Sequence, residues 1–247
     1  MRRSRTMLTM PVTVEIIGNG IRRADFQTVY NIFNQADRIF STFRDDSEIS
    51  RINRGEISIH QASPTLRYVL ALAEATKKDT SGYFDIHRPD GLDPLGIVKG
   101  WMINEAAKEL RRRGFKNFFI EVGGDIQADG LSEEGKKWQV GIRNPFNKEE
   151  IIKVVELSAF GIATSGTYER GRHIYNPKKD FDEANKIVSL TVIGSDVYEA
   201  DRFATAAFAM GEKGIQFIEK LPDFEGYMIN RNGVATLTTG WKKHEIH

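Results

Sequence analysis

Cysteine is absent from this chain of 247 residues. The absence excludes a disulfide, a catalytic thiolate and a metal site built on cysteine. An apolar run that could cross a membrane is also missing, since a spanning helix takes about 20 such residues. The formal net charge is only +1, so we expect neither nucleic acid nor an acidic partner. The chemistry of the chain must therefore come from oxygen and nitrogen groups.

The amino-terminal segment, MRRSRTMLTMPVTVEIIG, is basic but lacks the apolar core and cleavage site of a secretory signal. Within it, PVTVEIIG has the alternating pattern of a strand instead. We therefore expect a cytoplasmic protein. A chain whose leader had been removed for an extracytoplasmic location would have the same pattern.

Amphipathic helices and strands follow one another irregularly along the chain. Helices are predicted over residues 23–40, 65–78, 99–113 and 197–210, with a further short helix begun by Ser47. Because strands and helices mix without a regular βαβ order, the sequence predicts an α+β fold with mixed or antiparallel sheets. No linker or internal repeat divides the chain, so we expect one domain over residues 1–247.

The helix predicted over 197–210 carries two polar residues on its apolar stripe. Asp201 and Thr205 lie one turn apart, on the face that also holds Ala204 and Phe208. Both polar side chains offer hard oxygen ligands, which suit Mg²⁺ or Ca²⁺. Alternatively, a neighbouring backbone or arginine satisfies Asp201, and Thr205 bonds back to its own helix. Spacing alone slightly favours this alternative.

The segment LDPLGIVKG, residues 92–100, combines glycines with a lysine. Gly96 and Gly100 allow backbone to approach a ligand closely. Lys99 is expected where a helix begins, so its charge and the free N–H groups would face an anion such as phosphate. An ordinary junction between a loop and a helix explains the same residues, and is favoured when the segment is considered alone.

Two further segments are weaker signals. In EVGGDIQ, the glycine pair indicates either backbone packed against a ligand or another loop, or a β-bulge, and Asp125 would touch a ligand or brace a turn. In IATSGTYERGRHIYNP, His173 would stack on a ligand, hydrogen-bond to it or transfer a proton. A histidine with a purely structural role is the alternative.

Six segments, taken in order, resemble one family: FSTFRDDSEISRIN, GYFDI, LDPLGIVKG, EVGGDIQ, IATSGTYERGRHIYNP and SDVYEADRFATAAFAMG. The set is similar to the FAD:protein FMN transferases, also called flavin transferases or ApbE proteins, over about residues 11–240. The chain resembles a short form without a lipoprotein leader. The resemblance implies an α+β unit of two intertwined subdomains, with FAD in the cleft between them.

The resemblance also implies an activity. Members use Mg²⁺ to transfer FMN from FAD to a threonine hydroxyl of an acceptor flavoprotein, with release of AMP. The alternatives are Mg²⁺-dependent hydrolysis of FAD to FMN and AMP, as in some members, and a non-catalytic flavin-binding protein. The expected ligands are thus FAD as substrate, Mg²⁺ and an acceptor that presents a threonine.

Site residues follow from the matching motifs. The resemblance implies that Asp201 and Thr205 bind the metal through side chains, and Gly96 and Ala204 through backbone carbonyls. Asp201 is also the candidate base that takes the proton of the acceptor threonine. Contacts to the flavin nucleotide are implied for Phe43, Asp93, Lys99 and His173. Phe43 stands where relatives often have tyrosine, and the stretch before Lys99 is shorter than in longer relatives, so the flavin side matches less well.

Overall fold

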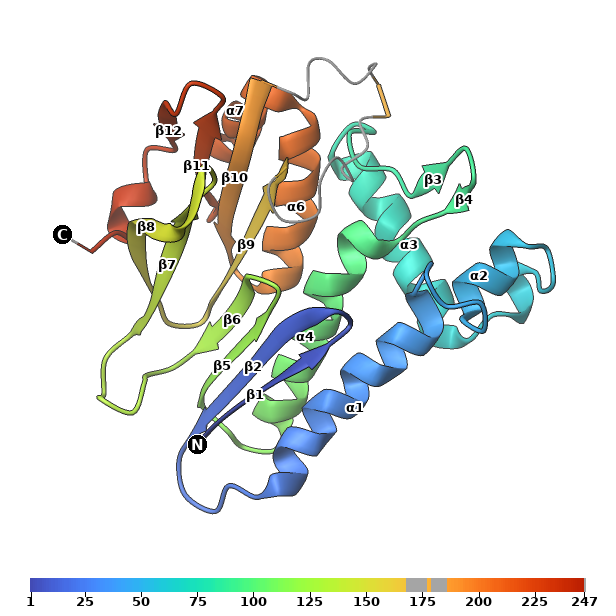
Figure 1. The fold of residues 1–247 in the computed structure, drawn as a ribbon, viewed down its shortest axis with the longest axis horizontal. Helices are drawn as coiled ribbons and strands as arrows, with labels where there is room; N and C mark the ends of the chain where they lie inside the picture. Colours follow the sequence, from blue (N-terminus) through green and yellow to red (C-terminus); the bar gives the residue numbers. More distant parts are fainter. Residues whose placement is uncertain (168–176, 179–185, 247) are drawn as a thin grey trace.

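The computed structural model describes residues 1–167, 177–178 and 186–246 (Figure 1). Its centre is an eight-stranded sheet of order β1-β2-β5-β6-β9-β10-β11-β12, in which every neighbouring pair is antiparallel. The strands are β1 (Arg2–Met7), β2 (Met10–Ile17), β5 (Asn117–Val122), β6 (Asp125–Asp129), β9 (Phe160–Gly166), β10 (Ile187–Gly194), β11 (Glu225–Asn230) and β12 (Ala235–Leu237). The predicted α+β class is confirmed, with antiparallel sheets rather than mixed ones.

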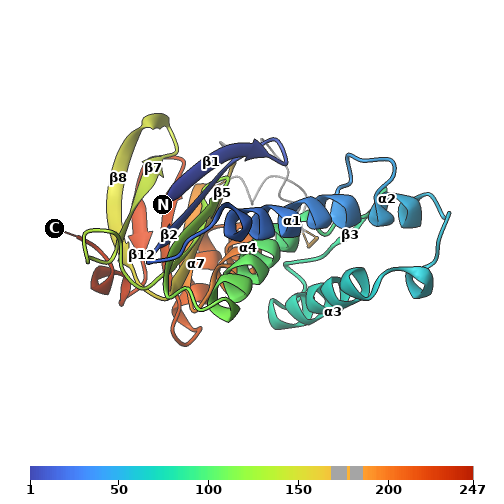
Figure 2. The ribbon, with the colours of Figure 1, turned by 90° about the horizontal axis from the view of Figure 1, so that it is seen from below.

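Helices pack on one face of this sheet, and a two-stranded ribbon packs on the other (Figures 1 and 2). The helices on the sheet are α1 (Arg23–Phe40), α4 (Leu95–Arg112), α6 (Val197–Ala209) and α7 (Gly214–Glu219), while α2 (Glu48–Asn53) and α3 (Pro64–Asp79) lie farther from its strands (Figure 1). The 3₁₀ turns are η1 (Ile59–Gln61), η3 (Gly211–Lys213) and η4 (Trp241–Lys243). The ribbon consists of β7 (Trp138–Asn144) and β8 (Asn147–Leu157), and a smaller one of β3 (His87–Arg88) and β4 (Gly91–Leu92). No helix in the described part of the chain combines the length and hydropathy that crossing a bilayer requires.

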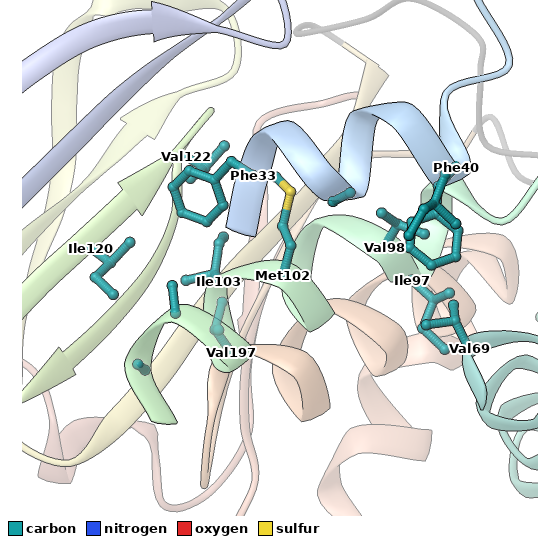
Figure 3. Close-up of a cluster of buried hydrophobic side chains, with 14 of the residues drawn as sticks. Phe33, Phe40, Val69, Ile97, Val98, Met102, Ile103, Ile120, Val122 and Val197 are labelled. Atoms are coloured by element: carbon teal, nitrogen blue, oxygen red, sulfur yellow. The ribbon is translucent and has the colours of Figure 1, made fainter. Parts of the chain in front are cut away.

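The main apolar core lies between the sheet and α1 and α4. Figure 3 shows Phe33 of α1 and Met102 and Ile103 of α4 beside Ile120 and Val122 of β5. All five side chains are buried. Burial of each such side chain contributes about 1.5–3 kcal/mol of transfer free energy. This core fixes α4 against the sheet, and α4 in turn supports α6.

Helix α4 begins earlier than the sequence predicted. The structure starts it at Leu95, after Pro94, whereas glycines at 96 and 100 lower helix propensity and led to a predicted start at residue 99. Lys99 therefore lies inside the helix, and the expectation that it stands at the helix start is wrong. Glycine is needed at position 100, because α6 passes very close to α4 there.

The glycine pair in EVGGDIQ forms neither a β-bulge nor a break in one strand. Gly123 and Gly124 are the two-residue turn of the β5–β6 hairpin, with Val122 paired to Asp125 across it. Their φ angles are +55° and +90°, a combination that glycine adopts without strain and that suits tight hairpin turns. A Cβ at Gly123 would stand 2.7 Å from the sulfur of Met10, so this turn packs against the β1–β2 hairpin.

Candidate functional site

The polar pair of α6 faces α4. Asp201 is only 5% exposed, and its Oδ2 accepts a hydrogen bond of 2.8 Å from the backbone N–H of Gly100. Thr205 Oγ1 lies 3.4 Å from the carbonyl oxygen of Gly96. A neighbouring backbone group thus bonds to Asp201, as the alternative explanation expected. Thr205 contacts α4 rather than bonding back to its own helix. Ala204 is fully buried beside them.

Strand β9 supplies a further hydroxyl to this cluster. Ser165 Oγ lies 3.5 Å from Thr205 Oγ1. The oxygen atoms of Gly96 and Ser165 therefore both lie within 3.5 Å of Thr205 Oγ1, one helical turn beyond the buried Asp201. Ser165 lies in one of the segments that match the family, but the motif gives it no role, and only its place on the helix-facing side of β9 identifies it.

Lys99 contacts a carboxylate on the sheet. Its Nζ lies 2.7 Å from Asp125 Oδ2, and the two side chains are 16% and 1% exposed. Asp125 Oδ1 also accepts a hydrogen bond of 3.2 Å from the backbone N–H of Thr164. β6 begins at Asp125 and pairs with β9 only from Ile126 onward, whereas β9 extends past this pairing to Gly166. The Asp125 carboxylate therefore bonds to the part of β9 that β6 does not pair with. The sequence left the role of Asp125 open between a turn and a ligand.

Asp125 is the first of three polar side chains on the helix-facing side of β6. Gln127 accepts a hydrogen bond of 2.9 Å from the backbone N–H of Val197, at the start of α6, and donates one of 2.9 Å to Asp129. Asp129 receives two hydrogen bonds from Arg111 of α4, of 2.6 and 2.8 Å. This row therefore fixes both helices of the site to one strand.

Two of the remaining predicted residues lie near the start of α4 and the end of α1. Asp93 Oδ1 accepts a hydrogen bond of 3.1 Å from the N–H of Leu95, so Asp93 satisfies a free donor at the start of α4. Phe43 follows α1 and is 90% exposed. His173 lies outside the described residues.

Asn53 was missed by the sequence analysis. Its amide donates to the carbonyl of Leu92 at 2.9 Å and accepts from the N–H of Leu92 at 2.8 Å. These two bonds attach α2 to β4, just before Asp93. A Cβ on Gly91 would stand 2.6 Å from the same amide, so glycine is required there. Nothing in the local pattern pairs an asparagine with backbone 39 residues away.

Asp85, in the GYFDI segment, has the most perturbed carboxyl near the start of α4. Burial raises its pKa, but hydrogen bonds from Lys77 and from the backbone and ring of His87 outweigh burial and lower the pKa to about 2. The Lys77 ammonium lies 2.7 Å from Asp85 Oδ2. The network connects the end of α3 to β3, the first strand of the hairpin that precedes α4.

The donor atoms at the α4–α6 contact fit a hard cation. Among the described residues they are a carboxylate, two hydroxyls and one backbone carbonyl, with no nitrogen or sulfur ligand. Among the described residues, no three histidine or acidic side chains gather in a way that could hold a metal. A cation here would thus have one carboxylate and complete its shell with neutral oxygens, water or substrate phosphate. Mg²⁺ is bound in this way, whereas zinc prefers nitrogen and sulfur ligands.

Solved structures with the same fold include ApbE proteins from several bacteria. A flavin transferase ApbE from Vibrio cholerae superposes with a TM-score of 0.85 at 22% identity, covering 99% of this chain and 98% of that one. An ApbE protein from Thermotoga maritima gives 0.86 at 20% identity, covering 100% and 99%. These likenesses establish the fold.

Sequence comparison gives the family. A FAD:protein FMN transferase of Vibrio cholerae is 32% identical over 131 residues, and one of Haemophilus influenzae is 32% identical over 158. The matches cover 49% and 59% of this chain but only 39% and 45% of those relatives, so the chain spans less than half the length of either. The ApbE family profile matches residues 8–88 and 87–228. Together these ranges include most of the sequence, and the chain belongs to the ApbE family.

Proposed function

We propose that the chain catalyses Mg²⁺-dependent transfer of FMN from FAD to a threonine hydroxyl of an acceptor protein, releasing AMP. The observation that carries the proposal is the contact of α4 with α6, where Asp201, Thr205 and the Gly96 carbonyl come together. Relatives that carry the name FAD:protein FMN transferase support the choice of FAD as substrate.

In this proposal, Asp201 and Thr205 hold Mg²⁺ through side-chain oxygens, and Gly96 and Ala204 through backbone carbonyls. Bound Mg²⁺ supplies positive charge that neutralises the pyrophosphate. The Gly100 N–H orients Asp201 by holding one of its carboxylate oxygens. The pair formed by Lys99 and Asp125 keeps a cationic group at the first turns of α4. The protein therefore contributes mainly positioning and electrostatic stabilisation, which dominate phosphoryl transfer.

The bond changes of the proposed reaction are simple. The acceptor threonine oxygen attacks the phosphorus of the FMN half of FAD, and the bond between that phosphorus and the bridging oxygen breaks. AMP leaves with the bridging oxygen. Asp201 accepts the threonine proton, a role that requires its carboxylate not to be fully committed to the metal. Asp201→Asn should therefore keep FAD binding and lose transfer.

The test follows AMP and FMN by chromatography after incubation of the protein with FAD and either Mg²⁺ or a chelator. A parallel series adds candidate acceptor proteins with an accessible threonine, in which covalently attached FMN marks transfer. We expect Mg²⁺-dependent AMP release and protein-bound FMN, both lost in Asp201→Ala. Glu212→Gln is the matched control, because Glu212 is an exposed carboxylate just beyond α6. AMP accompanied by free FMN alone would indicate hydrolysis, and bound but intact FAD would indicate a binding protein; either would overturn the transfer step.

A further inference from the structure

Asp125 has a position that none of the expected ligand contacts explains. Its carboxylate is 1% exposed and joins two elements, α4 through the Lys99 ammonium and β9 through the Thr164 N–H. A buried carboxylate is costly unless charge and hydrogen bonds compensate it. Here both are present, one on each carboxylate oxygen.

Both partners of Asp125 directly precede residues of the candidate site. Lys99 is followed by Gly100, whose N–H holds Asp201. Thr164 is followed by Ser165, whose hydroxyl lies 3.5 Å from that of Thr205. The Asp125 carboxylate thus holds Lys99 and Thr164. Each of these precedes a residue that contacts the Asp201 and Thr205 pair of α6. A change at Asp125 would shift those two contacts together.

We propose that Asp125 is a positioning residue, which sets the spacing of α4 and β9 around Asp201 and Thr205. Its role in turnover rests on the proposed function, whereas its role in holding the site does not. The negative charge of Asp125 opposes an anionic substrate, so its loss should not weaken attraction of the pyrophosphate. We therefore expect loss of Asp125 to affect the chemical step rather than substrate binding.

The first experiment measures backbone hydrogen exchange by NMR in the protein without ligand. Asp125→Asn should speed the exchange of the Gly100 N–H about tenfold, because local opening then costs less. The matched control is Asp25→Asn, which likewise neutralises a buried carboxylate. The partner of Asp25 is Arg113, just after the end of α4 that lies far from Gly100. Equal Gly100 exchange in the two variants would overturn the proposal.

The second experiment measures steady-state turnover of FAD well below the unfolding temperature. Asp125→Asn should lower kcat about tenfold and leave the KM for FAD unchanged or lower, while Asp25→Asn should change neither. A raised KM with unchanged kcat would overturn the proposal, since it would indicate a binding role. If the unsubstituted protein did not turn over FAD, only the proposed function would be contradicted. The hydrogen-exchange measurement would still decide the role of Asp125.

A further variant covers the case in which Asp125→Asn does not fold. Asp125→Glu keeps the charge and moves it by one methylene, so the ion pair with Lys99 is retained. We expect this variant to fold, to exchange the Gly100 N–H faster than the unsubstituted protein and to have a reduced kcat. If Asp125→Glu had the same Gly100 exchange rate and the same kcat as the unsubstituted protein, a positioning role that depends on geometry would be contradicted.

Discussion

The backbone N–H of Gly100 donates to Asp201 Oδ2 at 2.8 Å, although the two residues are 101 positions apart in the chain. The contact needs glycine. A Cβ at this position would stand 2.7 Å from Asp201 Cβ and 2.8 Å from the carbonyl oxygen of Val197. The two helices can therefore approach this closely only because residue 100 has no side chain.

Gly100→Ala should destabilise the protein by roughly 1–3 kcal/mol, since overpacking between two fixed helices outweighs the gain in helix propensity. Equilibrium unfolding in urea measures this loss. Gly96→Ala is the matched control in the same helix. Its Cβ would meet only the Phe84 ring at 3.3 Å and the Thr205 methyl at 3.5 Å. Similar losses in the two variants would argue against a special role for the contact at Gly100.

Lys99→Met should be more destabilising than Asp125→Asn. The methionine variant leaves a carboxylate that is 1% exposed without its cation, at a cost of roughly 3–5 kcal/mol. The asparagine variant leaves Lys99, whose side chain is 16% exposed and reaches water. The double variant, neutral at both positions, should recover most of the stability. A double-mutant cycle in urea measures the coupling, and additive losses would contradict it.

The ion pair of Asp85 predicts a dependence of stability on acid. Because the folded pKa is about 2 and the ordinary value is 3.8, the folded chain binds fewer protons at this group. The resulting stabilisation, about 2 kcal/mol, is fully present above about pH 4 and is lost as the pH falls through about 2. Urea unfolding of Asp85→Asn beside the unsubstituted protein, at pH 5 and pH 2, measures it. The difference between the two proteins should shrink toward the lower pH, and a constant difference would disprove this origin.

Phe43→Ala should separate ligand binding from folding. The ring is 90% exposed, so its removal should change the free energy of unfolding by less than about 0.5 kcal/mol. If the ring contacts the flavin, the Kd for FAD should rise several-fold, as expected from loss of one aromatic contact worth about 1 kcal/mol. Phe146→Ala is the control, since Phe146 is 58% exposed at the turn between β7 and β8. Equal FAD affinity in all three proteins would remove Phe43 from the site.

Periodicity was sufficient where a helix buries one stripe of apolar side chains. Residues 23–40 were predicted as a helix, and α1 has those bounds. Strand β1 was missed, because RRSRTM has no alternating apolar pattern. In the structure, the Arg3 and Arg5 guanidinium groups lie 5.4 and 3.5 Å from the ring centres of Phe26 and Tyr30. Charged residues thus cover aromatic ones there, which a hydrophobic pattern does not detect.

Only the part of the candidate site that lies within one helix could be predicted from the sequence. The single helical turn between Asp201 and Thr205 is readable from spacing, and α6 does place them together against α4. The partners of Asp201 and Lys99 come from other elements. No pattern in the neighbouring sequence connects Lys99 of α4 with Asp125 of β6. Such pairings depend on tertiary packing, which determines the site as much as the motifs do.

Strand β6 has a consequence for folding. Its helix-facing side carries Asp125, Gln127 and Asp129, while Ile126 and Ala128 join the apolar cluster beneath β7 and β8. A slip of one residue in strand pairing exchanges the two sides, because successive side chains point to opposite faces. The slipped strand would bury two carboxylates among apolar side chains and leave Lys99 and Arg111 without their partners. The same residues that hold the helices therefore also select one register during folding.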